Sequence, residues 1–328
     1  MGVTDVNSWT QCWCRRALWL GLGVGALAAP RVGAQVFVWD GGDYVTVVGA
    51  GHTTISSGET LNITLSADHF FVATALVNNG TTNWQDGGPL RAWSGASYTN
   101  NAAFNDQNVT DAVMYPTYDN SLYFSNSSSG VYTKSGAGTT TYNVVFNNDG
   151  TVIVQSGTLA FAAGGANNGT FVTSAGAKTQ FLNDYTLNAG SSLTGAGNYA
   201  LDGGTATFNG TVTVTHLLLN SGAMGGTQTF NNSTLEWTGT SLGTSGTTII
   251  GGTSVLNISG SGDKVFNLRA VVNNGTTNWT GGPLRAWSGG SLTNNAAFND
   301  QNSSNAIAYP TYDSSFYFQN SLGATYTK

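Results

Sequence analysis

Carboxylates with an arginine near them in the sequence are the residues that come nearest to a catalytic arrangement in this chain. Cleavage of a polysaccharide needs two or three acidic groups, often with an arginine or lysine, that converge in one groove. The side chains that could meet this need are Asp106, Asp119, Asp300, Asp313, Arg91 and Arg285. All six occur in duplicate at equivalent places, whereas an active site is usually unique. We therefore interpret them as turn or ladder residues and predict no catalytic residue.

Side chains that could hold a metal ion are few and scattered. The three histidines are His52, His69 and His216. No Cys/His cluster or zinc-type motif accompanies them. His216 is in phase with Val212 and Val214 of an alternating segment, so we expect a hydrogen-bonded packing residue. Asp-Gly-Gly turns, which resemble calcium-binding turns, begin at Asp40, Asp86 and Asp202. The repeated glycine-rich nonapeptide of such sites is absent, so we predict no metal and no cofactor.

Aromatic side chains are the best candidates for contact with a ligand, because exposed rings can form a platform on which sugars stack. The candidates are Trp84, Trp93, Tyr98, Tyr115, Tyr118, Trp279, Trp287, Tyr309 and Tyr312. The alternative is that these rings stack inside the fold. The same segments contain Pro89, Pro116, Pro283 and Pro310, which indicates a loop-rich excursion. We expect a partner to bind there, because loops on a rigid scaffold often carry recognition.

A long internal repeat organises the chain. VNNGTTNW at 77–84 returns at 272–279, and TNNAAFNDQN at 99–108 returns at 293–302. Aligning 77–134 with 272–328 needs one single-residue gap and gives 42 identities in 57 positions. The likeness continues upstream. We therefore place one copy at 52–134 and the second at 247–328, with intervening coils at 135–246.

The composition favours short strands and tight turns. Charged residues make up 8% of the chain, against roughly 25% in typical soluble proteins. Good helix-forming side chains are therefore scarce, and a mainly helical fold is disfavoured. A hydrophobic content of 40% argues against disorder. Asn-Gly, Asp-Gly and Gly-Gly turn signals separate runs of Val, Thr and aromatics, such as 151–155, 205–208 and 211–219.

These patterns predict an all-β, right-handed parallel β-helix, or β-solenoid, with loop-rich excursions. In such a fold each coil buries its apolar side chains against its neighbours, while Asn and Thr form ladders along the stack. The alternative is an array of β-sandwich repeats, which would need self-contained blocks of about 100 residues joined by linkers. We find no linker-like boundary within 36–328.

The repeat also resembles a known group of proteins. Its segments NNGTTNWTGGPLRAWSGGSLTNNAAFNDQN, VFNNDGTVIVQSGTLAF and YTLNAGSSLTGAGNYAL resemble bacterial secreted β-strand-repeat proteins. These are similar in style to filamentous-haemagglutinin and autotransporter-passenger solenoids. The resemblance covers essentially all of 45–328. It implies a right-handed β-helix, export and a structural or adhesive role without chemistry.

Residues 1–34 read as a secretory signal peptide. Two arginines precede the apolar run 17–29, and an A-x-A-like end predicts cleavage between Ala34 and Gln35. The run is shorter than the roughly 20 residues of a membrane span. Both cysteines, Cys12 and Cys14, lie in this segment. The mature region 35–328 would then have no cysteine, no membrane span and no basic patch for nucleic acid.

We therefore expect a secreted or cell-surface repeat protein, structural or adhesion-type and without catalytic activity. The alternative is a β-helix protein that binds carbohydrate or degrades polysaccharide. The expected partners are surface glycans or matrix components. The chain stops at Lys328, the counterpart of Lys134, where the first copy runs on. We thus expect it to be truncated at its C-terminus.

Overall fold

The structure is a computed structural model, which describes residues 34–44, 53–239, 241–303 and 305–328. The predicted signal peptide up to residue 33, both cysteines and His52 lie outside the described residues. Residues 34–328 form one compact unit. Among the described residues, all named regular elements are β-strands, and strands pair in parallel in each of five sheets. The described part contains no helix that is long and apolar enough to cross a membrane.

Three long sheets, which we call A, B and C, run along the stack. Sheet A contains β1 (Val36–Trp39), β4 (Thr60–Ile63), β7 (Thr81–Trp84), β10 (Ala103–Asp106), β13 (Val131–Lys134), β16 (Thr151–Val154), β19 (Thr170–Thr173), β22 (Ser192–Thr194) and β25 (Thr213–Val214). Sheet B contains β2 (Gly42–Asp43), β5 (His69–Val72), β8 (Leu90–Trp93), β11 (Ala112–Pro116), β14 (Thr139–Tyr142), β17 (Thr158–Phe161), β20 (Lys178–Phe181), β23 (Asn198–Leu201), β26 (His216–Leu219), β29 (Thr234–Trp237), β31 (Val255–Ile258), β34 (Thr276–Trp279), β37 (Ala297–Asp300) and β40 (Thr325–Thr327). Sheet C contains β3 (Thr54–Ile55), β6 (Ala75–Asn78), β9 (Ser97–Asn100), β12 (Tyr123–Asn126), β15 (Val145–Asn148), β18 (Gly165–Asn167), β21 (Tyr185–Asn188), β24 (Thr205–Asn209) and β27 (Ala223–Gly226).

Two shorter sheets, D and E, complete the C-terminal coils. Sheet D contains β28 (Gln228–Phe230), β30 (Gly246–Ile250), β33 (Arg269–Asn273), β36 (Ser291–Asn294) and β39 (Tyr317–Asn320). Sheet E contains β32 (Lys264–Val265), β35 (Leu284–Ala286) and β38 (Ala308–Pro310).

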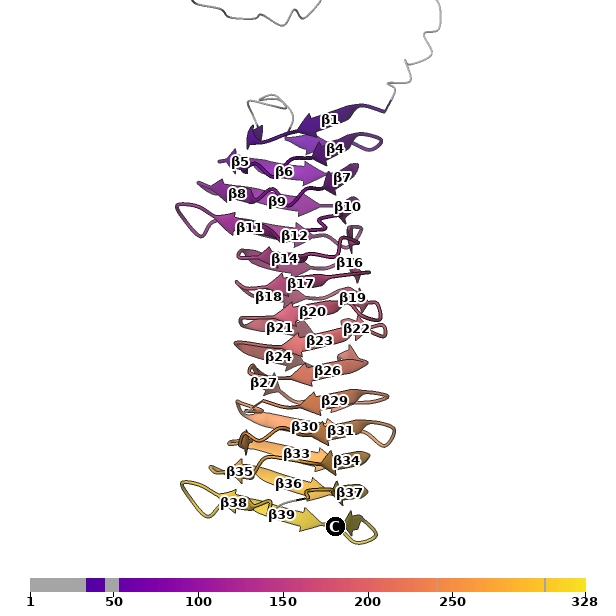
Figure 1. The fold of residues 1–328 in the computed structure, drawn as a ribbon, viewed down its shortest axis with the longest axis vertical. Helices are drawn as coiled ribbons and strands as arrows, with labels where there is room; N and C mark the ends of the chain where they lie inside the picture. Colours follow the sequence, from indigo (N-terminus) through magenta and orange to yellow (C-terminus); the bar gives the residue numbers. More distant parts are fainter. Residues whose placement is uncertain (1–33, 45–52, 240, 304) are drawn as a thin grey trace, which may run out of the picture. The chain divides into compact units, whose positions relative to one another are not determined.

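The strands form a three-sided parallel β-solenoid, in which most coils place one strand on each face (Figure 1). Strands β7, β8 and β9 lie in sheets A, B and C, and β10 returns to sheet A beside β7. The predicted β-solenoid is therefore confirmed. An array of sandwiches is excluded, because their sheets are built from antiparallel strands.

Apolar side chains fill the inside of the coils and stack from one coil to the next. Within β16, Val152 and Val154 are buried, while Thr151 and Ile153 are half-buried. The Phe124 ring stacks on Tyr98 in the coil before it, with centroids 5.3 Å apart. Offset stacks of this kind contribute about 0.5–1.5 kcal/mol beyond the burial of apolar area. Each coil thus shelters the apolar side chains of its neighbours.

A buried ladder of asparagines runs along one corner of the stack. The ladder consists of the last residues of five successive strands of sheet C, Asn78, Asn100, Asn126, Asn148 and Asn167. Each Nδ2 donates to the Oδ1 of the next asparagine at 2.7–2.8 Å. Because these amides are shielded from water, their hydrogen bonds form only when the coils lie in register. A second ladder joins Asn273, Asn294 and Asn320 at 2.7–2.8 Å.

The second copy of the repeat is displaced by one face of the three-sided coil. The TTNW strand is β7 in sheet A but β34 in sheet B, and the LRA strand is β8 in sheet B but β35 in sheet E. Sheet E continues the face of the coil that sheet C occupies. Isolated bridges show this, because they connect Met224 of sheet C to Gly243 and connect Ser241 to Val265 of sheet E. Strand β34 lies nine strands after β8 in sheet B. The repeat is therefore nine coils and one further face long.

Arg269 joins the coils where sheets D and E begin. Its guanidinium is buried and donates to the Met224 carbonyl oxygen at 2.7 Å and to that of Thr244 at 3.0 Å. It also donates to Thr248 Oγ1 at 2.9 Å. Burial lowers the pKa of Arg269 to about 10, so the group stays charged at neutral pH. The planar donors of arginine can bond several carbonyl oxygens at once, which links strands from different coils.

The prediction that His216 packs in phase with Val212 and Val214 is wrong. The segment 211–219 is two strands, β25 and β26, with a corner at Thr215 between them. Because the corner resets the alternation, Leu217 takes the inward position and His216 is half-buried. Sequence alternation alone does not mark a corner without Gly or Asn.

The buried asparagine ladder should contribute to the local stability of the coils that it joins. Replacing Asn126 by Ala leaves the Nδ2 of Asn100 and the Oδ1 of Asn148 without their ladder partner, at a cost of about 2–3 kcal/mol. We expect amide hydrogen exchange to accelerate in strands β9 to β16, because solenoids open locally.

The matched control is Asn105→Ala, since Asn105 belongs to a half-buried outer ladder and donates to Asn83 Oδ1 at 2.9 Å. We expect it to cost less than about 1 kcal/mol. Equal losses of protection in the two variants would contradict a special role for the buried ladder.

Candidate functional site

Three cavities of the described part each lack a pair of carboxylates. Their volumes are about 340, 430 and 620 Å³. Asp300 is the one acidic residue among the side chains that line these three. A hydrolase would need a second carboxylate facing the first across a substrate. The described residues also contain no group of three or more His, Cys, Asp or Glu that could hold a metal ion.

Asp106 points into the solenoid, where its oxygens are used by neighbouring side chains. Its Oδ2 lies 3.7 Å from Lys134 Nζ, and both side chains are fully buried. The Tyr132 hydroxyl donates to Oδ2 at 2.8 Å, and Asn108 Nδ2 donates to Oδ1 at 2.9 Å. Desolvation lowers the pKa of Lys134. This carboxylate is therefore part of the buried interior of the solenoid and is not at a surface where a substrate could bind.

Asp300 repeats the arrangement at the last described coil. It accepts hydrogen bonds from the Tyr326 hydroxyl at 2.9 Å and from Lys328 Nζ at 3.2 Å. Here the lysine side chain is 59% exposed, whereas Lys134 is fully buried. In the 328-residue chain the same motif thus occurs once with a buried lysine and once with an exposed lysine that is the last residue of the sequence.

Asp119 and Asp313 hold a protruding loop against the preceding coil. Asp119 Oδ2 accepts from the Ser94 backbone NH at 2.8 Å, and Asp313 Oδ2 accepts from Ser288 at the same distance. The Ser121 hydroxyl also donates to Asp119 and is the main cause of the lowered pKa of that carboxyl. Both aspartates are loop anchors at equivalent places in the two copies, in agreement with our interpretation of them as turn residues.

The structure separates the aromatic candidates into buried and exposed rings. Trp84, Tyr98 and Trp279 lie inside the coils. The Trp84 indole NH donates to the Gly88 carbonyl oxygen at 2.9 Å. These three rings cannot meet a ligand at the surface, so the alternative interpretation, stacking inside the fold, holds for them. The remaining candidates reach the surface.

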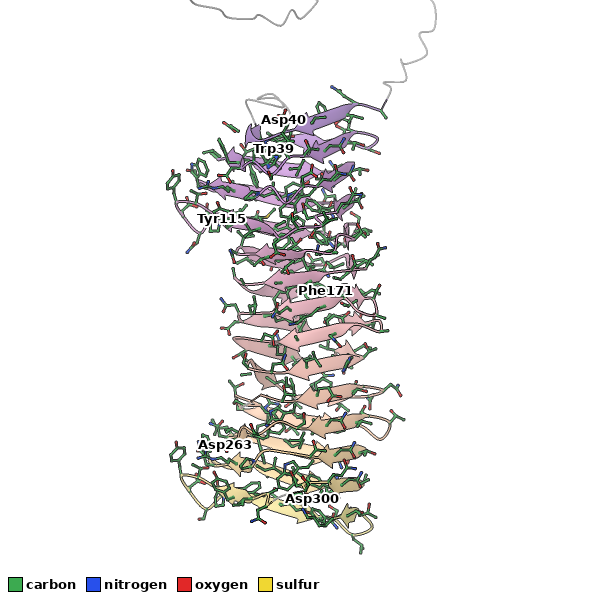
Figure 2. All side chains as sticks on the ribbon, in the orientation of Figure 1. Trp39, Asp40, Tyr115, Phe171, Asp263 and Asp300 are labelled. Atoms are coloured by element: carbon green, nitrogen blue, oxygen red, sulfur yellow. The ribbon has the colours of Figure 1, made fainter. Side chains whose placement is uncertain are left out.

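We call Asp68, Arg91, Trp93, Tyr115 and Tyr118 the first surface cluster, of which Figure 2 labels Tyr115. The Trp93 and Tyr118 rings meet edge to face with centroids 5.2 Å apart, and Tyr118 is 79% exposed. The Arg91 guanidinium pairs with Asp68 and lies over the Tyr115 ring, 5.1 Å from its centroid. The cluster presents aromatic rings beside an ion pair that is neutral as a whole.

The second surface cluster consists of Asp263, Arg285, Trp287, Tyr309 and Tyr312. Trp287 and Tyr312 meet edge to face at 4.9 Å, and Tyr312 is 77% exposed. Arg285 pairs with Asp263 and lies 5.2 Å from the centroid of Tyr309. The two clusters therefore have the same rings, ion pair and geometry.

One position beneath the tryptophan differs between the clusters. Phe70 stacks on Trp93 with centroids 5.8 Å apart and lies beside Arg91 in the sheet. Val265 takes the corresponding place beside Arg285. The indole of the second cluster thus lacks a stacked aromatic support.

Sequence reasoning missed the partners of the two arginines. Asp68 and Arg91 are 23 residues apart, on different coils, and only the register of the stack brings them together. Thr117 was missed in the same way: Arg91 Nε donates to its hydroxyl at 3.2 Å. The recurrence of Asp68 as Asp263 in the repeat was the signal that could have found the first of these.

Two further polar candidates, His69 and Asp202, have structural partners. His69 is buried, and its Nε2 lies 2.8 Å from the Thr64 carbonyl oxygen and 3.0 Å from that of Trp39. Asp202, from one of the Asp-Gly-Gly turns, pairs with Lys178 at 2.9 Å. Neither arrangement contains a second metal-ligating side chain.

Comparison of the chain with known proteins found no related family, protein or structure. The chain matches no protein-family model, and no curated protein or solved structure was found to be similar to it. Its assignment as a parallel β-solenoid rests on its own strand pairing.

The sealed and open copies of the Asp–Lys pair predict different responses to one substitution. Asp106→Asn leaves Lys134 buried without its counter-charge, so we expect a loss of about 3–5 kcal/mol in the free energy of unfolding. Asp300→Asn leaves Lys328 without its counter-charge, but this lysine is exposed to water. The substitution should therefore lower the free energy of unfolding by less than about 1 kcal/mol. Urea unfolding followed by circular dichroism measures both.

A second variant separates charge burial from general damage. Adding Lys134→Met to Asp106→Asn removes the unpaired ammonium and should recover most of the loss. Equal destabilisation by Asp106→Asn and Asp300→Asn, or no recovery in the double variant, would contradict this account of the pair.

Proposed function

We propose that the chain is a secreted or cell-surface scaffold of the structural or adhesion type, without catalytic activity. The observation that supports this most is the duplication of both its stabilising and its exposed features. The Asp–Lys pair, the buried asparagine ladder and the surface cluster each occur in both copies. A scaffold gains from presenting one surface several times, whereas an enzyme needs a single converging site.

The chemistry of the outer surface is consistent with this role. Asn, Thr and Ser occupy many of the exposed positions that the structure describes, and charged residues are 8% of the chain. The resemblance to filamentous-haemagglutinin and autotransporter-passenger solenoids supports a place outside a bacterial cell. A solenoid suits such a location because each coil is stabilised by its neighbours without disulfides.

Carbohydrate binding is the second candidate function. The observation that favours it is the exposure of Tyr118 and Tyr312 next to an indole ring on anchored loops. Aromatic side chains with one apolar face and one polar edge are suited to sugar rings, which also have apolar faces and polar edges. Binding of this kind would make adhesion selective and is compatible with the scaffold.

The scaffold proposal is tested with beads coated with the full chain. We expect such beads to adhere to surfaces that carry polysaccharide or extracellular-matrix protein, while bovine serum albumin beads do not. We also expect no release of reducing ends or unsaturated sugars from the polysaccharides. Released products would contradict a role without catalysis, and failure to adhere to every surface would contradict an adhesive one.

Export is tested by the N-terminus of the protein made in a bacterium. We expect the full chain to be exported and to begin at Gln35, because the apolar run 17–29 with its preceding arginines is read by the export machinery. Leu20→Arg interrupts that run and should retain the uncut chain in the cytoplasm. N-terminal sequencing distinguishes these results, and a wild-type chain that stays uncut inside the cell would contradict export.

A further inference from the structure

The two surface clusters lie on the same side of the stack. In Figure 1, β8 and β11 lie at the left near the top, and β35 and β38 lie at the left near the bottom. The loops that follow β11 and β38, which carry Tyr118 and Tyr312, both project to the left. Figure 2 shows Tyr115 of the first cluster and Asp263 of the second on this side.

Two opposing rotations explain this alignment. The second copy begins one face further round the coil than the first, which alone would turn its cluster away. The stack also twists, as β-sheets generally do. In Figure 1 the twist carries sheet B from the left, at β8, to the right, at β34. The shift by one face thus offsets the twist and returns the second cluster to the side of the first.

The distance between the clusters follows from the number of coils. Nine coils and one face separate them, and parallel strands lie about 4.8 Å apart, so the clusters are about 45 Å apart along the stack. Two equal sites at this spacing and on one side can be bridged by a single extended ligand.

The chemistry of the clusters selects the class of ligand. Each cluster offers an exposed tyrosine ring, set edge to face against a half-buried tryptophan, to stack on a sugar ring, and an Arg–Asp pair to bond hydroxyls. Because each arginine is neutralised by its own aspartate, the clusters do not favour an anionic polymer. An uncharged polysaccharide fits both the rings and the absence of net charge.

We propose that the two surface clusters bind one uncharged polysaccharide chain together, at two equivalent sites about 45 Å apart. This inference rests on carbohydrate binding, the second candidate function. Linking two weak contacts through one ligand raises the apparent affinity by a factor of about 10²–10⁴ when the ligand spans both sites.

The test compares long and short glycans on the full chain. The probes are β-1,4-glucan, β-1,3-glucan and β-1,4-mannan, each as soluble polymer and as disaccharide. We expect at least one polymer to bind, with an apparent affinity at least about 100-fold above that of its disaccharide. The disaccharide should bind with a stoichiometry of two per chain by calorimetry.

Variants at the most exposed rings test the pairing of the sites. Tyr118→Ala or Tyr312→Ala alone should lower the polymer affinity to near that of the disaccharide and reduce the disaccharide stoichiometry to one. Both substitutions together should abolish binding. The control is Val131→Ser with Leu322→Ser, which removes one exposed apolar residue from each copy outside the clusters and should leave binding unchanged.

The outcomes separate this inference from the scaffold proposal. No binding to any of the three polymers, or binding that survives loss of both tyrosines, would overturn the inference while leaving adhesion to other surfaces intact. Binding by one cluster alone, with no gain for the polymer, would overturn the shared ligand. Cleavage of a bound polymer would overturn the scaffold proposal itself.

Discussion

The register of each coil against the next is the constraint on which this structure depends. The strands of one coil do not pair with one another, so the NH and carbonyl groups of each strand inside a sheet are paired with the coils on either side. The buried asparagines make that register stricter, because their amides lie out of reach of water and bond to one another and to nearby backbone carbonyl and NH groups. A slip of one residue would turn the inward side chains outward and leave the amides unpaired. Register therefore determines the core, the ladder and the buried Asp–Lys pair together.

The same constraint determines where the chain can vary. Ladder residues are separated by 22 residues between Asn78 and Asn100, 26 between Asn100 and Asn126, and 19 between Asn148 and Asn167. Since the ladder positions must coincide, extra residues in the longer coil leave the stack as a loop. The 26-residue coil carries Tyr118, and the corresponding 26-residue coil between Asn294 and Asn320 carries Tyr312. The exposed rings thus lie on the part of each coil that the ladder leaves free, and Asp119 or Asp313 anchors that part.

Much of the fold was predictable from the sequence, but features that depend on the position of corners and on the register of the coils were not. The repeat, the Asn-Gly turns and the scarcity of charge predicted a β-solenoid, because each is a local consequence of stacking short strands. The face shift was not predictable, since it depends on how many corners lie between Trp84 and Trp279. His216 was placed inward for a related reason, because the sequence did not reveal the single corner at Thr215. Among the tryptophans, Trp84 is inward because it is in phase with Thr82, whereas Trp93 follows the inward Ala92 and faces outward. The ion pair of Arg91 required the register itself.

The distance between the two exposed tyrosines tests the central account most directly. Tyr118 and Tyr312 are replaced by cysteine in a chain that carries serine at Cys12 and Cys14, and spin labels are attached. Coils stacked in register, with the twist offset by the one-face shift, predict a single distance near 45 Å in pulsed electron paramagnetic resonance. A distance well below this value, or a broad distribution without a maximum, would contradict a continuous stack of coils between the two copies.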